Sequence, residues 1–319
     1  MSVKASNNKK LSHLKRKLLG FNLTDGLIYK IFVYVLLISI SYVFLYPLIK
    51  MISMAFMSTQ DIINPEVEWI PTQLSLQNLI VAADVLNVPT TLINSMWFST
   101  LLALAQTSVS AITGYAFSQF KFKFKGFWFG MLIASFIIPV PILLIPRLMM
   151  FTSLQDITSI KIIGSLIPQL SLSLLGQGVY STILVLIFYN FFNLIPKVLD
   201  EAARIDGASA WQVFWHIFMK MSASTIFTVF LFSFVWNWNE TYVTSTFVRT
   251  SIDLLPAKLG AFDAVFSSSG AGTAGGSSLI NEAYKMAGTL ISMAPLLIMY
   301  LFVQKRFVEG IENTGITGE

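Results

Sequence analysis

Cysteine is absent from this 319-residue chain, and histidine occurs only twice, at His13 and His216. Without cysteine the chain can form no disulfide, no thiolate metal site and no cysteine nucleophile, and two histidines cannot build a histidine-rich metal centre. Charged residues are also scarce, at 12% of the chain, which is roughly half of their share in soluble domains. No G-x-x-x-x-G-K-[ST] sequence is present, so the chain lacks the usual loop that holds nucleotide phosphates. We expect no cofactor to be bound by this chain.

Apolar residues are abundant instead: 55% of the chain is hydrophobic and the mean hydropathy is +0.70. Windows of roughly 20 apolar residues, long enough to cross a hydrocarbon core of about 30 Å, occur six times. They lie near 31–54, 96–119, 127–149, 172–194, 223–238 and 286–304. Lipid offers no partner to backbone polar groups and no alternating barrel pattern appears, so each window should be helical. The sequence predicts an all-α integral membrane protein with six transmembrane helices.

The basic residues indicate which side of the membrane each segment faces. Seven of the 21 lysines and arginines lie within residues 1–30, which the positive-inside rule places in the cytoplasm. Counting six spans from there puts 15 of the 21 inside, together with both termini. No small-residue cleavage site follows the first window, so we expect it to remain as an anchor. We attribute the net charge of +5 to orientation and not to nucleic-acid binding.

These counts divide the chain into a basic cytoplasmic segment at 1–30, a six-helix membrane domain at 31–304 and a cytoplasmic tail at 305–319. Within the membrane domain, a charged insert at 196–220 falls inside and a long loop at 239–285 falls outside.

The insert begins with the signals of a short helix. Pro196 suits the start of a helix and Gly207 suits a left-handed residue that ends one, which predicts a helix over 197–206. Val198, Ala202 and Ile205 follow at helical spacing and form one apolar stripe. Asp200 and Arg204 lie four residues apart, as in a weak surface ion pair.

A second amphipathic helix should follow the glycine. Ser209 and Gln212 have the spacing of a capping box. Trp211, Phe214, Trp215 and Phe218 then give this helix an aromatic face that leads back to the bilayer. On these residues alone, an ordinary cytoplasmic hairpin between two spans is the better interpretation, and a docking element is the alternative.

The spacing of Glu201-Ala202-Ala203, Gly207 and Ile217 decides for docking, because it resembles the EAA loop of importer-type ABC transporter permeases. In that family the loop transmits the force of ATP hydrolysis from a separate ATPase subunit. The resemblance implies that the ATPase-coupling residues here are Glu201, Ala202, Ala203, Asp206, Gly207 and Ile217.

Further landmarks are similar to those of sugar-importer permeases, and the resemblance covers about residues 25–319. They are Asn94-Ser95, Gly114-Tyr115-Ala116-Phe117, Ile138-Pro139, Ile145-Pro146, Trp236-Asn237-Trp238-Asn239-Glu240 and Phe307-Val308-Glu309-Gly310. The chain resembles the smaller, six-span subunit typified by the maltose permease G component. This implies a type I ABC importer permease fold in a bacterial cytoplasmic (inner) membrane. It also implies a second permease subunit, two ATPase subunits that bind the ATP and Mg, and an extracellular or periplasmic sugar-binding protein.

Two positions depart from the family pattern. Met219-Lys220 stands where the family usually has Leu-Pro, so we expect the second helix of the insert to continue unbroken into the fifth span. The tail from Gly310 ends in Glu319 and is acidic, where the family ends in Lys-Gly, which leaves any contact of the tail with the ATPase open.

The outer loop 239–285 contains Gly270, Gly272 and Gly275, which spell the dinucleotide motif G-x-G-x-x-G. Since they follow serines and not a strand, a flexible linker is the better interpretation. The loop is expected either to contact the sugar-binding protein or to act as a plain tether. Trp236 and Trp238 are expected to anchor its base at the membrane interface.

Polar residues within the spans are candidates for the solute path, since an amide in hydrocarbon must face protein or water. Gln106 and Asn190 have the best depth, and Tyr189, Trp236 and Asn237 could add stacking and hydrogen bonds to a sugar. Alternatively, Gln106 and Asn190 bridge neighbouring helices and the aromatic residues lie at the membrane surface.

The sequence therefore predicts the permease subunit of an ATP-driven importer for sugars or oligosaccharides, not an enzyme. A permease for a non-sugar solute remains the nearest alternative. A secondary transporter would need ionisable residues for ion coupling, of which the spans hold almost none. A membrane hydrolase would need a catalytic cluster that is not evident.

Overall fold

The computed structural model describes residues 26–268 and 278–311, and for residues 278, 279 and 305–311 it describes the backbone alone. Three features discussed above lie outside the described residues: most of the basic N-terminal segment, the glycine motif at 270–275 and the acidic end of the tail.

The described chain is almost entirely helical and contains no strand, only an isolated bridge between Met57 and Leu74. This confirms the predicted all-α class. The helices are α2 (Leu27–Phe56), α3 (Thr59–Ile63), α4 (Gln77–Leu86), α5 (Val88–Gln119), α6 (Lys125–Ile137), α7 (Val140–Thr158), α8 (Ile167–Leu174), α9 (Ser181–Leu194), α10 (Lys197–Ile205), α11 (Ala210–Val213), the π-helical η1 (Phe214–Phe218), α12 (Met219–Met221), α13 (Ala223–Asn239), α14 (Tyr242–Phe247), α15 (Leu255–Gly260), α16 (Phe262–Ser268) and α17 (Ser278–Ile311).

Among the described residues, four helices are long and apolar enough to cross a bilayer, and six spans result if each of two bent helix pairs counts as one. The first, second and sixth predicted windows fall within the single helices α2, α5 and α17. The third window, 127–149, is interrupted at Pro139, a proline that is expected to kink or end a helix. The fourth window, 172–194, was predicted as one helix and is also interrupted, so that prediction is wrong.

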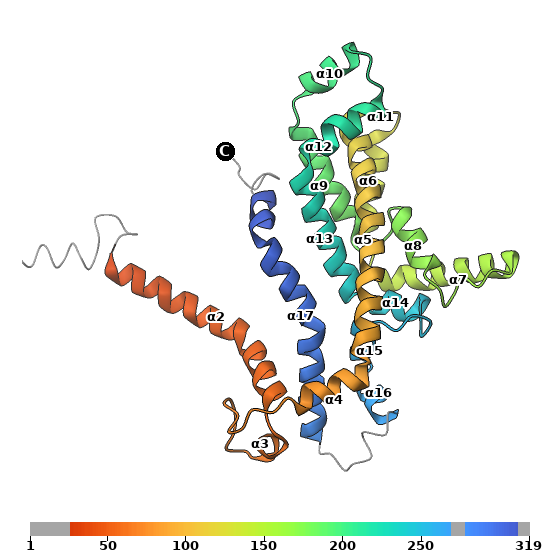
Figure 1. Ribbon diagram of the computed structural model, residues 1–319. Coiled ribbons are helices and arrows are strands. Elements are labelled where there is room, and N and C mark those ends of the chain that lie inside the picture. Colours follow the sequence, from red (N-terminus) through yellow and green to blue (C-terminus); the bar gives the residue numbers. More distant parts are fainter. Residues whose placement is uncertain (1–25, 269–277, 312–319) are drawn as a thin grey trace, which may run out of the picture. The chain divides into compact units, whose positions relative to one another are not determined.

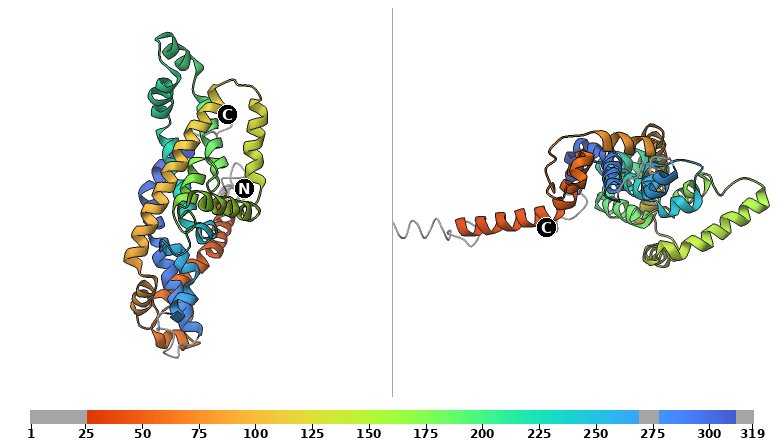
Figure 2. Two further views of the ribbon diagram at one scale, coloured as in Figure 1. Left: turned by 90° about the vertical axis from the view of Figure 1, so that its right-hand side faces the viewer. Right: turned by 90° about the horizontal axis from the view of Figure 1, so that it is seen from below.

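The third window breaks at Pro139, which separates α6 from α7 with an extended backbone conformation (φ −60°, ψ 135°). Proline cannot donate the hydrogen bond that a continuous helix needs at this point, and it disfavours helical geometry in the residue before it. The axis of α7 consequently lies at a large angle to those of α5, α9 and α13 (Figures 1 and 2).

The fourth window breaks at residues 175–180, between α8 and α9. Gly176 (φ +71°) and Tyr180 (φ +50°) both adopt left-handed conformations there. Left-handed residues cannot continue a right-handed helix, so the chain changes direction between α8 and α9.

The described chain forms two compact units, of which the first comprises residues 26–78 and 278–287. In this unit most side chains of α2 are exposed, so its surface is available to lipid or to other subunits. The segment after α2 is held by the Asp61 carboxylate, which accepts hydrogen bonds from the backbone of Thr72 (3.0 Å) and Gln73 (3.3 Å) and from the Thr72 hydroxyl.

The second unit comprises residues 79–277 and 288–319. Its centre is α5, which packs along α9 and α13 (Figure 1). Gly114 permits the close approach to α9, because a Cβ there would lie 2.7 Å from Phe188 Cβ and 3.0 Å from the Tyr189 nitrogen. Buried aromatic side chains fill the end of this bundle that lies beside the 196–220 insert, among them Tyr115, Phe192 and Phe218.

The first part of the 239–285 loop is not an irregular linker, since α14, α15 and α16 form in it and pack on the second unit. Asn94 Nδ2 donates to the Asp253 carbonyl (3.1 Å), and the Leu255 backbone N–H donates to Ser95 Oγ (2.8 Å). The predicted interfacial placement of Trp238 is also wrong: its side chain is 2% exposed and packs against Phe234.

Candidate coupling hairpin and transport-path cavity

The 196–220 insert folds as the predicted helix, glycine turn and helix. Helix α10 ends at Ile205, and Gly207 adopts φ +86°, which confirms the left-handed turn. The Ala208 N–H donates to the Ala203 carbonyl (2.9 Å) and the Gly207 N–H to the Arg204 carbonyl (3.1 Å). These two bonds form a Schellman motif, which satisfies carbonyls that the end of the helix would otherwise leave free.

Local polar contacts make each arm of this hairpin stiff. The Arg204 side chain lies 2.9 Å from an Asp200 carboxylate oxygen, as predicted. Ser209 and Gln212 form the predicted capping box, with the Ser209 N–H donating to Gln212 Oε1 (2.8 Å) and the Gln212 N–H to Ser209 Oγ (3.3 Å).

The second arm is fixed to the helical bundle. Phe214 and Phe218 are each 1% exposed and pack with Tyr115 of α5, at ring-centroid distances of 5.0 and 4.9 Å. The Tyr115 hydroxyl also donates to the Ala210 carbonyl (3.2 Å). Movement of the hairpin is therefore coupled mechanically to the end of α5.

The first arm of the hairpin is α10, and one of its faces points away from the rest of the chain, at one end of the bundle (Figure 1). Glu201, Ala202 and Asp206 are exposed, and Ile205 is 86% exposed. Ala203, like Ile217 on the second arm, is partly buried against the bundle core. The six residues proposed for coupling thus divide between a free outer face, the hinge glycine and an inner face that contacts the membrane helices.

The expectation that the second helix continues unbroken into the fifth span is wrong. The helical run from Ala210 to Met221 meets α13 at an angle of 82°. The break is at Ser222 (φ −96°, ψ 21°), whose hydroxyl donates to the Met219 carbonyl (3.2 Å). Short polar side chains can compete in this way with regular helical hydrogen bonding.

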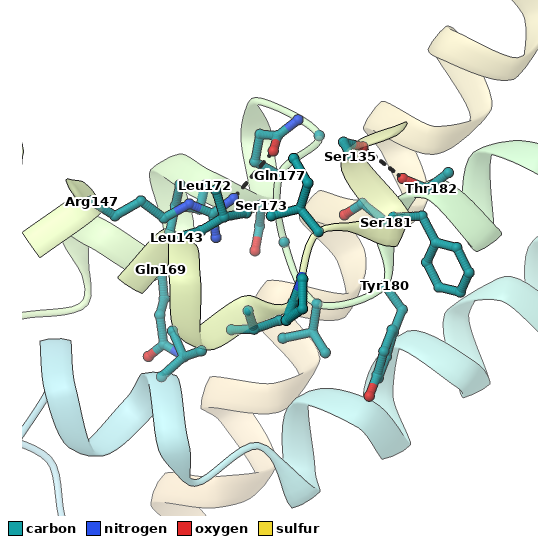
Figure 3. Close-up of a pocket in the computed structure, with 18 of the residues that line it drawn as sticks. Ser135, Leu143, Arg147, Gln169, Leu172, Ser173, Gln177, Tyr180, Ser181 and Thr182 are labelled. Carbon is teal, nitrogen blue, oxygen red and sulfur yellow. Dashed lines mark hydrogen bonds between the residues drawn. The ribbon is translucent and has the colours of Figure 1, made fainter. Parts of the chain in front are cut away.

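A cavity of about 360 Å³ lies where the α6–α7 and α8–α9 breaks come together (Figure 3). Its wall combines apolar side chains with a set of polar ones: Ser135, Arg147, Gln169, Ser173, Gln177, Tyr180, Ser181, Thr182 and Asn237. Broken helices thus produce a polar chamber within a mostly apolar body, which is where irregular backbone is tolerated in a membrane protein.

Below this chamber, Gln106 of α5 forms a buried polar network. Its Nε2 donates to the Val179 carbonyl (3.3 Å), while its Oε1 accepts from Asn237 Nδ2 (2.9 Å) and from the Ser233 hydroxyl. Gly178 makes room for it, because a Cβ there would lie 1.9 Å from Gln106 Nε2. Gln106 therefore bridges helices, as the alternative interpretation had it.

The five residues predicted for the solute path do not form one group. Asn237 lines the chamber, and Gln106 hydrogen-bonds to it. Trp236 meets the wall residue Tyr180 edge-to-face, with ring centroids 5.0 Å apart. Tyr189 instead packs on Phe129 of α6, and Asn190 is exposed. The sequence analysis missed Arg147, Gln169, Gln177, Tyr180 and Thr182. Arg147, a lone cation directly after Ile145-Pro146, was the one available signal.

A helical, apolar body with an external hairpin and without a phosphate-binding loop is the arrangement expected of the membrane subunit of a transporter whose ATPase is a separate chain. The comparisons agree: residues 106–313 match the family model described as "Binding-protein-dependent transport system inner membrane component", and the chain belongs to that family. It is thus a transport-system permease and not an enzyme.

Individual relatives support the assignment. The chain is 28% identical over 292 residues to the "Probable ABC transporter permease protein YurM" of Bacillus subtilis (strain 168), covering 90% of this chain and 87% of the relative. It is 26% identical over 223 residues to the "sn-glycerol-3-phosphate transport system permease protein UgpE" of Shigella flexneri serotype 5b (strain 8401), covering 70% and 72%.

A solved structure confirms the type I ABC importer permease fold. It is a bacterial ABC transporter involved in the import of the acidic polysaccharide alginate, and it matches with a TM-score of 0.70 at 20% identity. The match covers 88% of this chain and 96% of that one.

Proposed function

We propose that this chain is the permease subunit through which an ATP-driven importer admits sugars or oligosaccharides. The observation that carries the proposal is the stiff hairpin at 196–220, since a transporter driven by an ion gradient has no use for such an external arm. The relatives named for sn-glycerol-3-phosphate and alginate support a polyhydroxylated solute. The amide and hydroxyl groups around the chamber suit such a solute.

Coupling would run from the ATPase through the hairpin into the bundle. The exposed face of α10, with Glu201, Ala202 and Asp206, would enter a groove on the ATPase. ATPase closure would then move the hairpin as a rigid body whose two arms are joined at Gly207, and the Phe214–Tyr115 contact would pass that movement to α5. Switching between inward and outward access is the expected result.

The complete importer would contain this chain, a second permease, two ATPase subunits and an extracellular or periplasmic solute-binding protein. In this arrangement the hairpin and both termini face the cytoplasm, and the 239–285 loop faces the binding protein. The packing of α14 and α15 on the ends of α5 and α8 fits that role, because a docked partner would contact a folded surface.

Reconstitution tests this function. The chain, its second permease and the ATPase would be placed in liposomes, with the binding protein outside and ATP inside. We expect uptake of a labelled sugar that requires both ATP and the binding protein. Uptake that persists without ATP and follows an ion gradient would favour a secondary transporter, and ATP-dependent uptake of other solutes alone would favour a non-sugar permease.

A further inference from the structure

The chamber between the helix breaks holds one charged side chain. Arg147 of α7 is the only ionisable acid or base among its described lining residues apart from the Tyr180 phenol, and no carboxylate faces it. The Arg204–Asp200 and Lys258–Asp253 ion pairs lie elsewhere. The cation therefore has no counter-ion from the described residues.

Arg147 is also incompletely hydrogen-bonded. One nitrogen, Nη2, donates to Gln177 Oε1 at 3.2 Å, which orients the guanidinium along the chamber wall (Figure 3). A guanidinium has five N–H donors in a planar fork, and no other hydrogen bond from it was found within the described residues. The remaining donors can bind the oxygens of a carboxylate or phosphate, for which the fork is well matched.

Gln169 provides a second, independent indication of a ligand. Its side chain is 5% exposed and lines the same chamber, yet its Oε1 has no hydrogen-bond partner among the described residues. Its Nε2 donates to Thr244 Oγ1 (2.9 Å). Because the Thr244 hydroxyl already donates to the Glu240 carbonyl (2.7 Å), it accepts from Gln169. The amide orientation is thereby fixed, and Oε1 is left as a buried acceptor.

A buried acceptor without a partner is rare and costly in folded proteins. A solute hydroxyl would satisfy it, just as a solute anion would satisfy Arg147. The guanidinium needs an anionic acceptor and the amide oxygen needs a hydrogen-bond donor, and a polyhydroxylated anion has both.

We propose that this chamber binds a hydroxylated anion, with Arg147 contacting a carboxylate or phosphate group and Gln169 Oε1 accepting a hydrogen bond from a hydroxyl. The proposal rests on the permease function and narrows its solute to an acidic sugar or a phosphorylated polyol. A neutral sugar would leave the cation without an anionic partner, and ionisable groups within membrane proteins commonly mark solute paths.

Absence of cysteine from the chain makes the test specific. Leu143 lines the chamber and is half-buried, so Leu143→Cys places the chain's one thiol beside Arg147. The assembled importer in lipid nanodiscs, without binding protein or ATP, would be labelled with uncharged N-ethylmaleimide. Mass spectrometry would follow protection of the thiol by trigalacturonate, glycerol phosphate or neutral maltotriose. The same measurement would be made with Arg147→Gln and Arg147→Lys added, and with Arg249→Gln as a control on an exposed arginine outside the chamber.

We expect at least one anionic probe to protect the thiol, and its half-protecting concentration to rise about tenfold or more in Arg147→Gln. Arg147→Lys should weaken this protection less, and Arg249→Gln should leave it unchanged. Protection by trigalacturonate alone identifies a carboxylate, and protection by glycerol phosphate alone a phosphate. Equal protection in Arg147→Gln, protection by maltotriose only, or no protection by any probe would overturn the proposal. A faster or slower labelling rate in Arg147→Gln without solute, with unchanged protection, would reveal a purely structural role and also overturn it. The permease function is judged separately, by ATP-dependent uptake in liposomes.

Discussion

Replacing Gly207 by valine should uncouple ATP hydrolysis from transport. The residue sits at φ +86° between the arms of the hairpin, and a Cβ added there would meet no atom within 4 Å. The cost is therefore backbone strain and not a clash, about 1–2 kcal/mol for a side-chain-bearing residue in the left-handed region. Such a cost corresponds to a factor of about 5–30 between the native turn and unstrained alternatives, which would misplace the outer face of α10.

Solute-stimulated ATPase activity and uptake per ATP hydrolysed would be measured in liposomes. Both should fall in Gly207→Val, while the amount of chain in the membrane stays normal, because the turn at Gly207 lies outside the helical bundle. Gly207→Asn is the matched control, since asparagine tolerates the left-handed conformation, and it should retain most of the coupling. Full coupling in Gly207→Val would refute the role assigned to the turn.

Other substitutions test separate parts of the account. Ala202→Trp should add too much bulk to the outer face of α10, and Glu201→Lys should reverse a charge there, so less ATPase should co-purify in each case. Unchanged retention of the ATPase would show that this face is not the docking surface. Gln106→Leu leaves Asn237 and Ser233 without their buried partner, so the unfolding temperature should fall, by an amount equivalent to about 1–3 kcal/mol; an unaltered temperature would contradict the network. The Thr72 hydroxyl and backbone N–H groups lower the pKa of Asp61, so Asp61→Asn should destabilise the protein most at neutral pH. The difference in stability between the wild-type chain and Asp61→Asn should shrink as the pH falls through the lowered pKa of Asp61. A difference that stays constant with pH would contradict a stabilising role of the ionised carboxylate. Deleting residues 267–278 should weaken stimulation of the ATPase by the binding protein and spare basal activity, whereas unchanged stimulation would leave that segment as a tether.

The hairpin could be predicted from the sequence because its determinants are local. Gly207, the Ser209–Gln212 capping box and the Asp200–Arg204 pair each act over a few residues, and their spacing is visible in the chain. The bend at Ser222 was not predicted, because a serine carries no strong helix-breaking signal and the proline usual in the family is missing nearby.

The chamber could not be predicted in the same way. Windows of hydropathy add up apolar residues whatever the backbone direction, so they do not show the break at residues 175–180. A proline such as Pro139 indicates a kink or an end of a helix, but not how far the chain turns there. Arg147 and Gln169 come together only because those breaks fold α7 and α8 around one cavity. Asn190 is exposed in this chain, and depth along a span does not say which face of the helix a residue occupies.

Photocrosslinking from Ile205 tests most directly whether the hairpin binds the ATPase. This side chain is 86% exposed at the end of α10, and a photoreactive amino acid there would be irradiated in the assembled importer. The same substitution at Ile157, which is 80% exposed near the end of α7, provides the control. We predict that adducts at position 205 form on the ATPase subunit and that position 157 gives none. Adducts from position 205 that reach only lipid or other proteins, with none on the ATPase, would contradict the account.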